Sequence, residues 1–81
     1  MKFRKKPVVI EAIQFNGDNV NEVTKAFPDK IIDGGDFLIV PTMEGDMKVS
    51  KDDWVIKGVA GEIYPCKPDI FKETYEKVDE Q

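Results

Sequence analysis

The sequence predicts an α+β fold: a small curved, mostly antiparallel β-sheet of about five or six strands with one packed α-helix. Two observations carry this prediction. Short runs rich in Val, Ile, Phe, Tyr and Trp alternate with turn signals built from Gly, Asp and Asn. Between two of these runs stands a single stretch with helical spacing of its apolar residues. The chain has 81 residues, which predicts one domain spanning residues 1–81.

The first predicted strand runs from Pro7 to Phe15. It is rich in Val and Ile, and apolar residues fall on both of its faces, which favours a central strand over an edge strand. The segment "NGD" at residues 16–18 then supplies residues typical of a turn.

A short helix is expected next, capped by Asp18 or Asn19. Glu22 stands three residues after Asn19, which is the spacing of a capping box. One apolar stripe follows at positions i, i+3 and i+7, and Pro28 is expected to end the helix. The stripe consists of Val20, Val23 and Phe27. A helix this short needs the sheet to stabilise it.

Further strands are expected at residues 31–32, at residues 37–40 up to Pro41, at 48–50 after a turn in "MEGDM", at 54–57 and at 62–66. Pro65 and Pro68 cannot donate to a sheet ladder, so this region belongs to an edge or an exit. The C-terminus has two interpretations. A helical face fits Ile70, Phe71, Thr74, Tyr75 and Val78, whereas "ETYEKV" also alternates as a strand would. One helical turn followed by a closing strand is preferred.

Composition excludes several kinds of function. The 12 Lys and Arg residues oppose 16 Asp and Glu residues, and four of the basic residues fall within the first six positions. The remainder is strongly acidic, so duplex nucleic acid is not an expected partner. With no histidine and a single cysteine, neither a zinc site nor an internal disulfide is expected, and no cofactor or metal is predicted.

The expected setting is the cytosol. The opening "MKFRKKPVVIEAIQF" lacks a signal-peptide cleavage site, and no segment approaches the ~20 apolar residues that span a membrane. A single cysteine agrees with a reducing compartment. Because so small a chain buries little surface and has no disulfide or metal, a homo-oligomer is expected.

Catalytic candidates are few. The absence of histidine removes the commonest general base and the usual activator of Ser and Cys nucleophiles. Cys66 could act as a nucleophile only if its pKa were lowered, with Lys67 adjacent; the alternative is a small packed residue. The paired carboxylates all fall at predicted turns, which accounts for them without a metal. The two glycines of "KGVAGE" lack the order of a phosphate loop and indicate a hairpin.

The stretch "DDWVIKGVAGEIYPCKPDIF", residues 52–71, combines aromatic rings with positive charge. Such a combination can hold a nucleotide by stacking and phosphate contact. The candidate ligand-binding residues are Trp54, Lys57, Tyr64, Lys67 and Lys72. In the alternative interpretation, the rings are core or interface anchors with lysines extending around them.

Two long blocks resemble a family of small phage and prophage proteins that takes its name from a Pro-Gly-Asp-Tyr-Gly-like motif. The blocks are "FRKKPVVIEAIQFNGDN" and "MEGDMKVSKDDWVIKGVAGEIYPCKPDIFKETYEKV", which together cover nearly the whole chain. The family shows an "RKKPVVIEA" opening and a "GD(Y/W)(I/V)IKGVxGExYPCKPDIFxxTY" block. At the motif itself this chain departs from "PGDY", because Asp52 stands in place of the glycine. The resemblance implies a viral gene product in the cytoplasm of a host bacterium, and it brings no established catalytic residues.

The expected function is therefore that of a non-enzymatic phage accessory protein that acts by stoichiometric binding. One form is counter-defence, in which the protein sequesters a small anionic ligand of nucleotide type. An alternative is a protein–protein interaction module that inhibits a host protein or assists virion assembly. A third, remote alternative is a Cys66-dependent enzyme.

Overall fold

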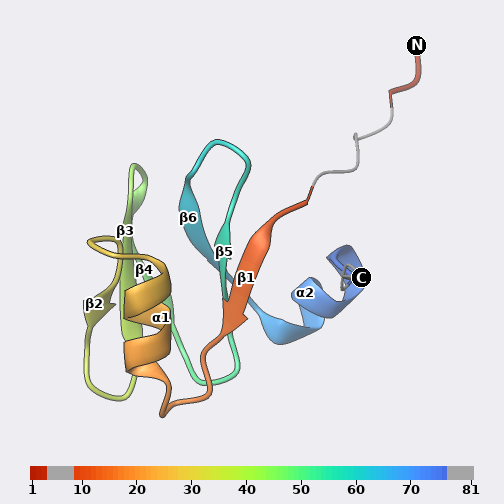
Figure 1. Cartoon of the computed structure of the whole chain (residues 1–81). Coiled ribbons are helices and arrows are strands. Elements are labelled where there is room, and N and C mark those ends of the chain that lie inside the picture. The colour runs from red at the N-terminus through yellow and green to blue at the C-terminus, as the bar shows by residue number, and fades with distance from the viewer. Residues whose placement is uncertain (4–8, 77–81) are drawn as a thin grey trace.

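The chain folds into two three-stranded antiparallel sheets and two helices, as the computed structural model shows for residues 1–3 and 9–76 (Figure 1). Sheet A has the strand order β1-β5-β6, and sheet B has the order β2-β3-β4. This arrangement confirms the α+β class, with two sheets where one curved sheet was expected. The elements are β1 (Glu11–Gln14), α1 (Val20–Ala26), β2 (Ile32–Asp33), β3 (Leu38–Thr42), β4 (Gly45–Val49), β5 (Trp54–Lys57), β6 (Ile63–Cys66) and α2 (Pro68–Thr74).

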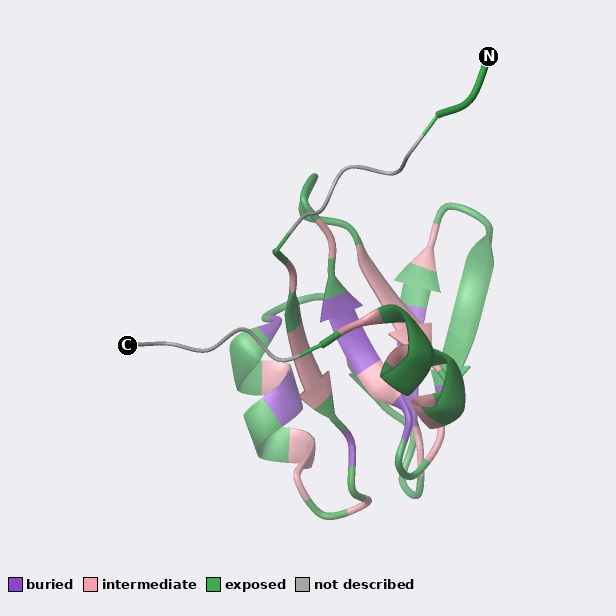
Figure 2. Cartoon of the chain, turned by 90° about the vertical axis from the view of Figure 1, so that its right-hand side faces the viewer, coloured by how far each residue is buried: buried purple, intermediate pink, exposed green. Residues whose placement is uncertain are grey.

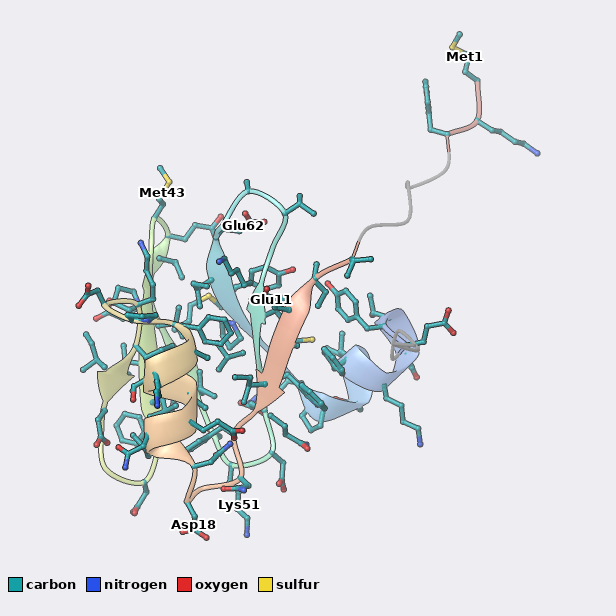
Figure 3. The ribbon with its side chains drawn as sticks, viewed as in Figure 1. Met1, Glu11, Asp18, Met43, Lys51 and Glu62 are labelled. Atoms are coloured by element: carbon teal, nitrogen blue, oxygen red, sulfur yellow. The ribbon has the colours of Figure 1, made fainter. Side chains whose placement is uncertain are left out.

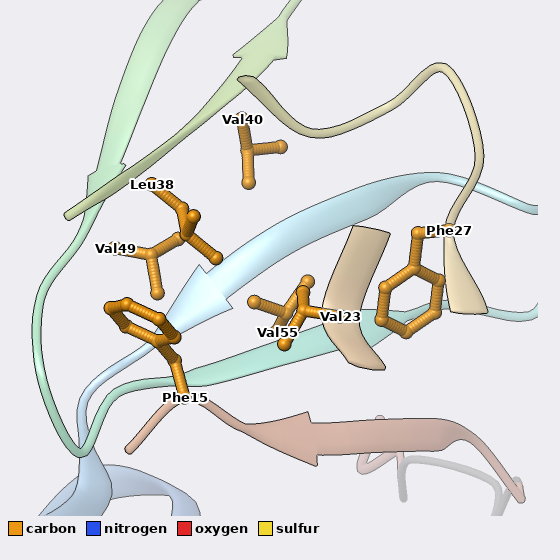
Figure 4. Close-up of a cluster of buried hydrophobic side chains, with 7 residues drawn as sticks. All are labelled: Phe15, Val23, Phe27, Leu38, Val40, Val49 and Val55. Atoms are coloured by element: carbon orange, nitrogen blue, oxygen red, sulfur yellow. The ribbon is translucent and has the colours of Figure 1, made fainter. Parts of the chain in front are cut away.

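The hydrophobic core is formed by residues of both sheets and of α1. Phe15, just after β1, packs in one cluster with Val55 of β5 and with Leu38 of β3 (Figure 4). All three side chains are fully buried. The other buried members are Val23, Phe27, Val40 and Val49. Because members come from α1, β3, β4 and β5, burial of apolar area holds the two sheets together.

Helix α1 confirms the predicted apolar stripe. Val23 and Phe27 are buried, and Val20 packs against the same cluster. Asn19 is the N-cap residue, but it donates from its side-chain amide to Glu22 Oε1 at 2.7 Å, and Asn19 Oδ1 accepts the Asn16 backbone N–H at 2.8 Å. The side chain of Asn19 therefore does not cap the helix, because its oxygen is hydrogen-bonded to the preceding turn and its amide to Glu22.

Strand β1 corrects one prediction. It pairs with β5 alone, so within residues 9–76 it is an edge strand of sheet A where a central strand was expected. Its two half-buried residues, Ala12 and Ile13, point to opposite faces. Both faces are apolar because sheet A is covered on both, by the core on one side and by α2 on the other (Figures 1 and 2). Of the predicted strand, Pro7 and Val8 lie outside the described residues, and Val9 and Ile10 precede β1.

Strand β3 continues through Pro41, where it was expected to end. Pro41 pairs with Asp46 of β4, and Thr42 pairs with Gly45, so only Met43 and Glu44 form the loop. On its other side β3 meets β2, which reaches only Leu38 and Ile39. Pro41 has no N–H to donate, but no described strand lies next to it on the β2 side of β3, so no hydrogen bond of the sheet is lost there.

Strands β5 and β6 lie where they were predicted, and Pro65 falls in an edge strand as expected. The C-terminal segment differs. Helix α2 includes Glu73 and Thr74, where a closing strand was preferred, with Pro68 at its first turn. The helix prevails because its spacing places aromatic side chains on sheet A. The remainder of the expected strand, residues 77–81, lies outside the described residues.

Candidate functional site

The candidate site lies on the face of sheet A that α2 covers. Trp54 of β5 stands between Gln14 of β1 and Cys66 of β6 in the strand register. Residues directly opposite in antiparallel strands share a face, so these three side chains form one row. The neighbouring row consists of Ala12, Ile56 and Tyr64 by the same register. Helix α2 begins two residues after Cys66 and turns back over this face.

Aromatic side chains join the helix to the sheet. The Trp54 ring stacks on Phe71 with 4.0 Å between ring centroids and 7° between planes. Phe71 in turn contacts Tyr75, with centroids 5.1 Å apart, across one helical turn. The Tyr75 hydroxyl lies 3.3 Å from that of Tyr64, within hydrogen-bonding distance. Each aromatic pair contributes about 0.5–1.5 kcal/mol beyond area burial. These rings therefore dock a helix that has no fully buried residue of its own.

An open hollow of about 460 Å³ lies beside these rings, which we call the aromatic hollow. It is lined by Gln14, Trp54, Pro68, Phe71, Lys72 and Tyr75. Its walls are therefore three aromatic rings, a proline ring and the stems of two long polar side chains. Lys72 is the one positively charged residue among them, and its side chain is exposed. Such a surface suits an apolar group carrying a single negative charge.

The structure brings together three of the five predicted ligand residues. Trp54 and Lys72 line the aromatic hollow, and Tyr64 adjoins it through Tyr75. Lys57 and Lys67 lie elsewhere. Lys57 is the last residue of β5, opposite Glu11, and an odd separation from Trp54 puts it on the other face of the sheet.

Lys67 is engaged in an ion pair. Its Nζ lies 3.0 Å from Asp53 Oδ2, and the side chain of Asp53 is only 4% exposed. The same carboxylate oxygen accepts the Ser50 backbone N–H at 2.9 Å. Asp53 thus locks the turn before β5 and ties it to the end of β6. This accounts for a buried carboxylate without a ligand or a metal.

Sequence reasoning missed Gln14, Pro68, Phe71 and Tyr75 as site residues. The signal for two of them was present, because Phe71 and Tyr75 have the i, i+4 spacing of one helical face. Assigning the segment from Glu73 onward to a strand hid this pairing. Gln14 gave no such signal, since only the register between β1 and β5 brings it next to Trp54.

Cys66 is half-buried, and burial together with the nearby carboxylates of Asp53 and Asp69 raises the pKa of its thiol. A nucleophilic cysteine requires the opposite shift. Across residues 1–3 and 9–76, no group of three or more His, Cys, Asp or Glu residues is placed to hold a metal ion. Two of the carboxylates predicted at turns lie in strands, Asp33 at the end of β2 and Asp46 in β4. Asp33 Oδ1 still supports the following turn, since it accepts the Gly35 N–H at 2.9 Å.

The chain matches no family model, and searches of curated proteins and of solved structures also returned no match. In the part of the chain that the structure describes, no helix has the length and apolar character needed to cross a membrane.

Proposed function

We propose that this chain is a non-enzymatic binding protein whose contact surface is the aromatic hollow and whose partner is another protein. The observation that carries the proposal is the run of rings Trp54–Phe71–Tyr75, which is packed yet only partly buried. Partly exposed Trp and Tyr side chains in a concave surface are typical of the residues that dominate protein interfaces. The partner segment would place an apolar side chain in the aromatic hollow, against the rings, and a carboxylate near Lys72.

The resemblance to small phage proteins supplies the biological setting of the proposal. In that setting the chain is a phage accessory protein that acts on a host protein in the bacterial cytoplasm by stoichiometric binding. Two features favour binding over catalysis. The sequence has no histidine, and the pKa of its one thiol is raised, so Cys66 is protonated near neutral pH.

A small anionic ligand of nucleotide type is the second candidate, and the position of Lys72 beside exposed aromatic edges favours it. Two observations rank it below a protein partner. One face of Trp54 is already covered by Phe71. Lys57 lies on the opposite face of sheet A, and Lys67 is paired with Asp53. A single lysine binds a phosphate group weakly, because nucleotide-binding sites use several charged and polar contacts to each phosphate.

Trp54 fluorescence distinguishes the two candidates, because it is the only tryptophan and it lines the hollow. Titration with mono-, di- and cyclic nucleotides up to millimolar concentration should leave its emission unchanged. A saturable change with any of them that is lost in Lys72→Glu but kept in Lys57→Glu would replace the protein partner by a nucleotide.

The protein partner is tested with three baits on a lysate of the host bacterium. The wild type and Lys57→Glu should retain the same protein, whereas Lys72→Glu should lose it, with all three baits equally folded by circular dichroism. Lys57 serves as the matched control because it is an exposed lysine on the opposite face of sheet A. Equal retention by Lys72→Glu would overturn the assignment of the hollow as the contact surface.

A further inference from the structure

Strand β4 presents a free edge to solvent. It is the outermost strand of sheet B, and among the described residues no strand pairs with its outer side. Its residues from Gly45 to Lys48 are all exposed, and Figure 2 shows this strand in the exposed colour at the margin of the molecule. Unpaired strand edges are templates for a further strand.

The direction of the free backbone groups follows from Pro41. Hydrogen-bonded and non-hydrogen-bonded pairs alternate along an antiparallel ladder. Pro41 has no N–H, so its pair with Asp46 is a non-hydrogen-bonded one, and so is the pair of Ile39 with Lys48. The backbone N–H and C=O groups of Asp46 and Lys48 therefore point away from β3, to the free edge. Those of Met47 point to its partner Val40.

We propose that β4 pairs antiparallel with β4 of a second copy of this chain, with the two-fold axis at Met47. In this register Asp46 lies opposite Lys48 of the second copy, and Lys48 lies opposite Asp46. Both are hydrogen-bonded pairs, which is what the outward direction of their backbone groups requires. The three strands of sheet B in each copy then join in one continuous sheet. The contact is isologous and closes as a dimer.

Side-chain charge selects this register. Asp46 and Lys48 are two residues apart, so both side chains lie on the outer face of sheet B, where Lys48 Nζ also lies 4.7 Å from the centre of the Phe37 ring. With the axis at Met47, two pairs of unlike charge face each other across the edge. An axis at Asp46 or at Lys48 would oppose like charges, which is unfavourable.

The other sheet edges are poorer candidates. Strand β2 has only two residues, and β6 contains Pro65, which cannot donate to a ladder. Strand β1 has the sequence EAIQ, whose single charge would have no opposite partner in a second copy. The aromatic hollow belongs to sheet A and α2, so pairing through β4 is independent of the proposed binding function.

Charge reversal tests the register. Asp46→Lys and Lys48→Asp should each weaken the dimer about tenfold or more, because each change sets like charges opposite each other in both pairs. An equimolar mixture of the two variants should restore the dimer, since every pair is again of unlike charge. Sedimentation velocity over a concentration series measures this, with circular dichroism to show that each variant is folded. A wild type that stays monomeric up to millimolar concentration, or a mixture no more associated than its components, overturns the proposal.

Cross-linking tests the position of the axis. In the proposed register the two Met47 Cα atoms are about 4.5 Å apart, within the range that a disulfide spans. Met43 is also an exposed methionine, at the hairpin tip labelled in Figure 3, and its two copies would be on the order of 20 Å apart. In a Cys66→Ser background, Met47→Cys should oxidise to a covalent dimer much faster than Met43→Cys. Equal rates, or a faster reaction at residue 43, contradict the register.

Discussion

Replacing Asp52 by glycine should stabilise the protein. Asp52 has φ of 76°, in the left-handed region that favours glycine. Its side chain is exposed, whereas its backbone is fixed at both ends: its N–H donates to Phe15 O at 2.6 Å, and its C=O accepts Gln14 Nε2 at 3.0 Å. The change to glycine removes the steric cost of this conformation and leaves both hydrogen bonds in place.

The expected gain is small but measurable. The left-handed conformation costs a non-glycine residue about 1–2 kcal/mol. Glycine also gives the unfolded chain more conformational freedom, which lowers the free energy of unfolding by about 0.5–1 kcal/mol. The net stabilisation is about 0.5–1 kcal/mol, which raises Tm by about 2–8 °C for a domain of this size.

Lys51→Gly is the matched control, because Lys51 is the preceding exposed residue of the same turn and its φ is not positive. It should lose about 0.5–1 kcal/mol, so the two glycine variants should differ by about 1–2 kcal/mol. Urea unfolding followed by Trp54 fluorescence gives both free energies of unfolding. If Asp52→Gly destabilises the protein as much as Lys51→Gly does, the conformational cost assigned to Asp52 is wrong.

Three further predictions concern the aromatic residues that dock α2 and the thiol of Cys66. Phe71→Ala removes the ring that stacks on Trp54, so it should cost about 2 kcal/mol of unfolding free energy and shift the tryptophan emission to longer wavelength; an unchanged spectrum would show that α2 does not cover this ring. The shared hydrogen bond with Tyr75 and partial burial raise the pKa of Tyr64 from 10.0 to about 12. Because the pKa is raised in the folded state, the stability contributed by the protonated Tyr64 hydroxyl is complete below pH 10 and is lost as the pH rises towards 12. Tyr75→Phe removes the hydrogen-bond partner, so the free energy of unfolding measured in urea should fall less over this pH range. An identical pH dependence in that variant contradicts the coupling. Burial raises the pKa of Cys66, so iodoacetamide should react more slowly with the folded protein than with the urea-unfolded chain, and equal rates would show an accessible, unshifted thiol.

The elements predicted well from the sequence are those specified by local patterns. The stripe of α1 carries its own signal, because one buried face imposes one helical period on the residues. The runs of β5 and β6 are signalled instead by their β-favouring Trp, Val, Ile and Tyr residues. The edge position of β1 in sheet A could not be predicted in the same way. Apolar residues on both faces indicate that both faces are covered, and either a central position or a helix packed on an edge strand produces that pattern.

The candidate site was predicted only in part, for a similar reason. Proximity in sequence placed Trp54, Lys57 and Lys67 in one cluster, but the alternation of a strand separates Trp54 from Lys57, and the buried carboxylate of Asp53 holds Lys67. The helix that completes the site competed with a strand interpretation of the same residues. The contact of Phe71 with Trp54, 17 positions away, decides between them in the folded protein.

The two sheets differ in when the chain can complete them. Sheet B is assembled from residues 32–49 by neighbouring strands, so each of its turns closes a short loop. Sheet A joins Glu11 to Lys57, and the whole of sheet B lies within the intervening segment. Closing this longer loop costs more conformational entropy than closing the turns of sheet B, and contacts of such large sequence separation slow folding. During synthesis from the N-terminus, β1 therefore waits without a partner until β5 has emerged, whereas the β3–β4 hairpin can already form.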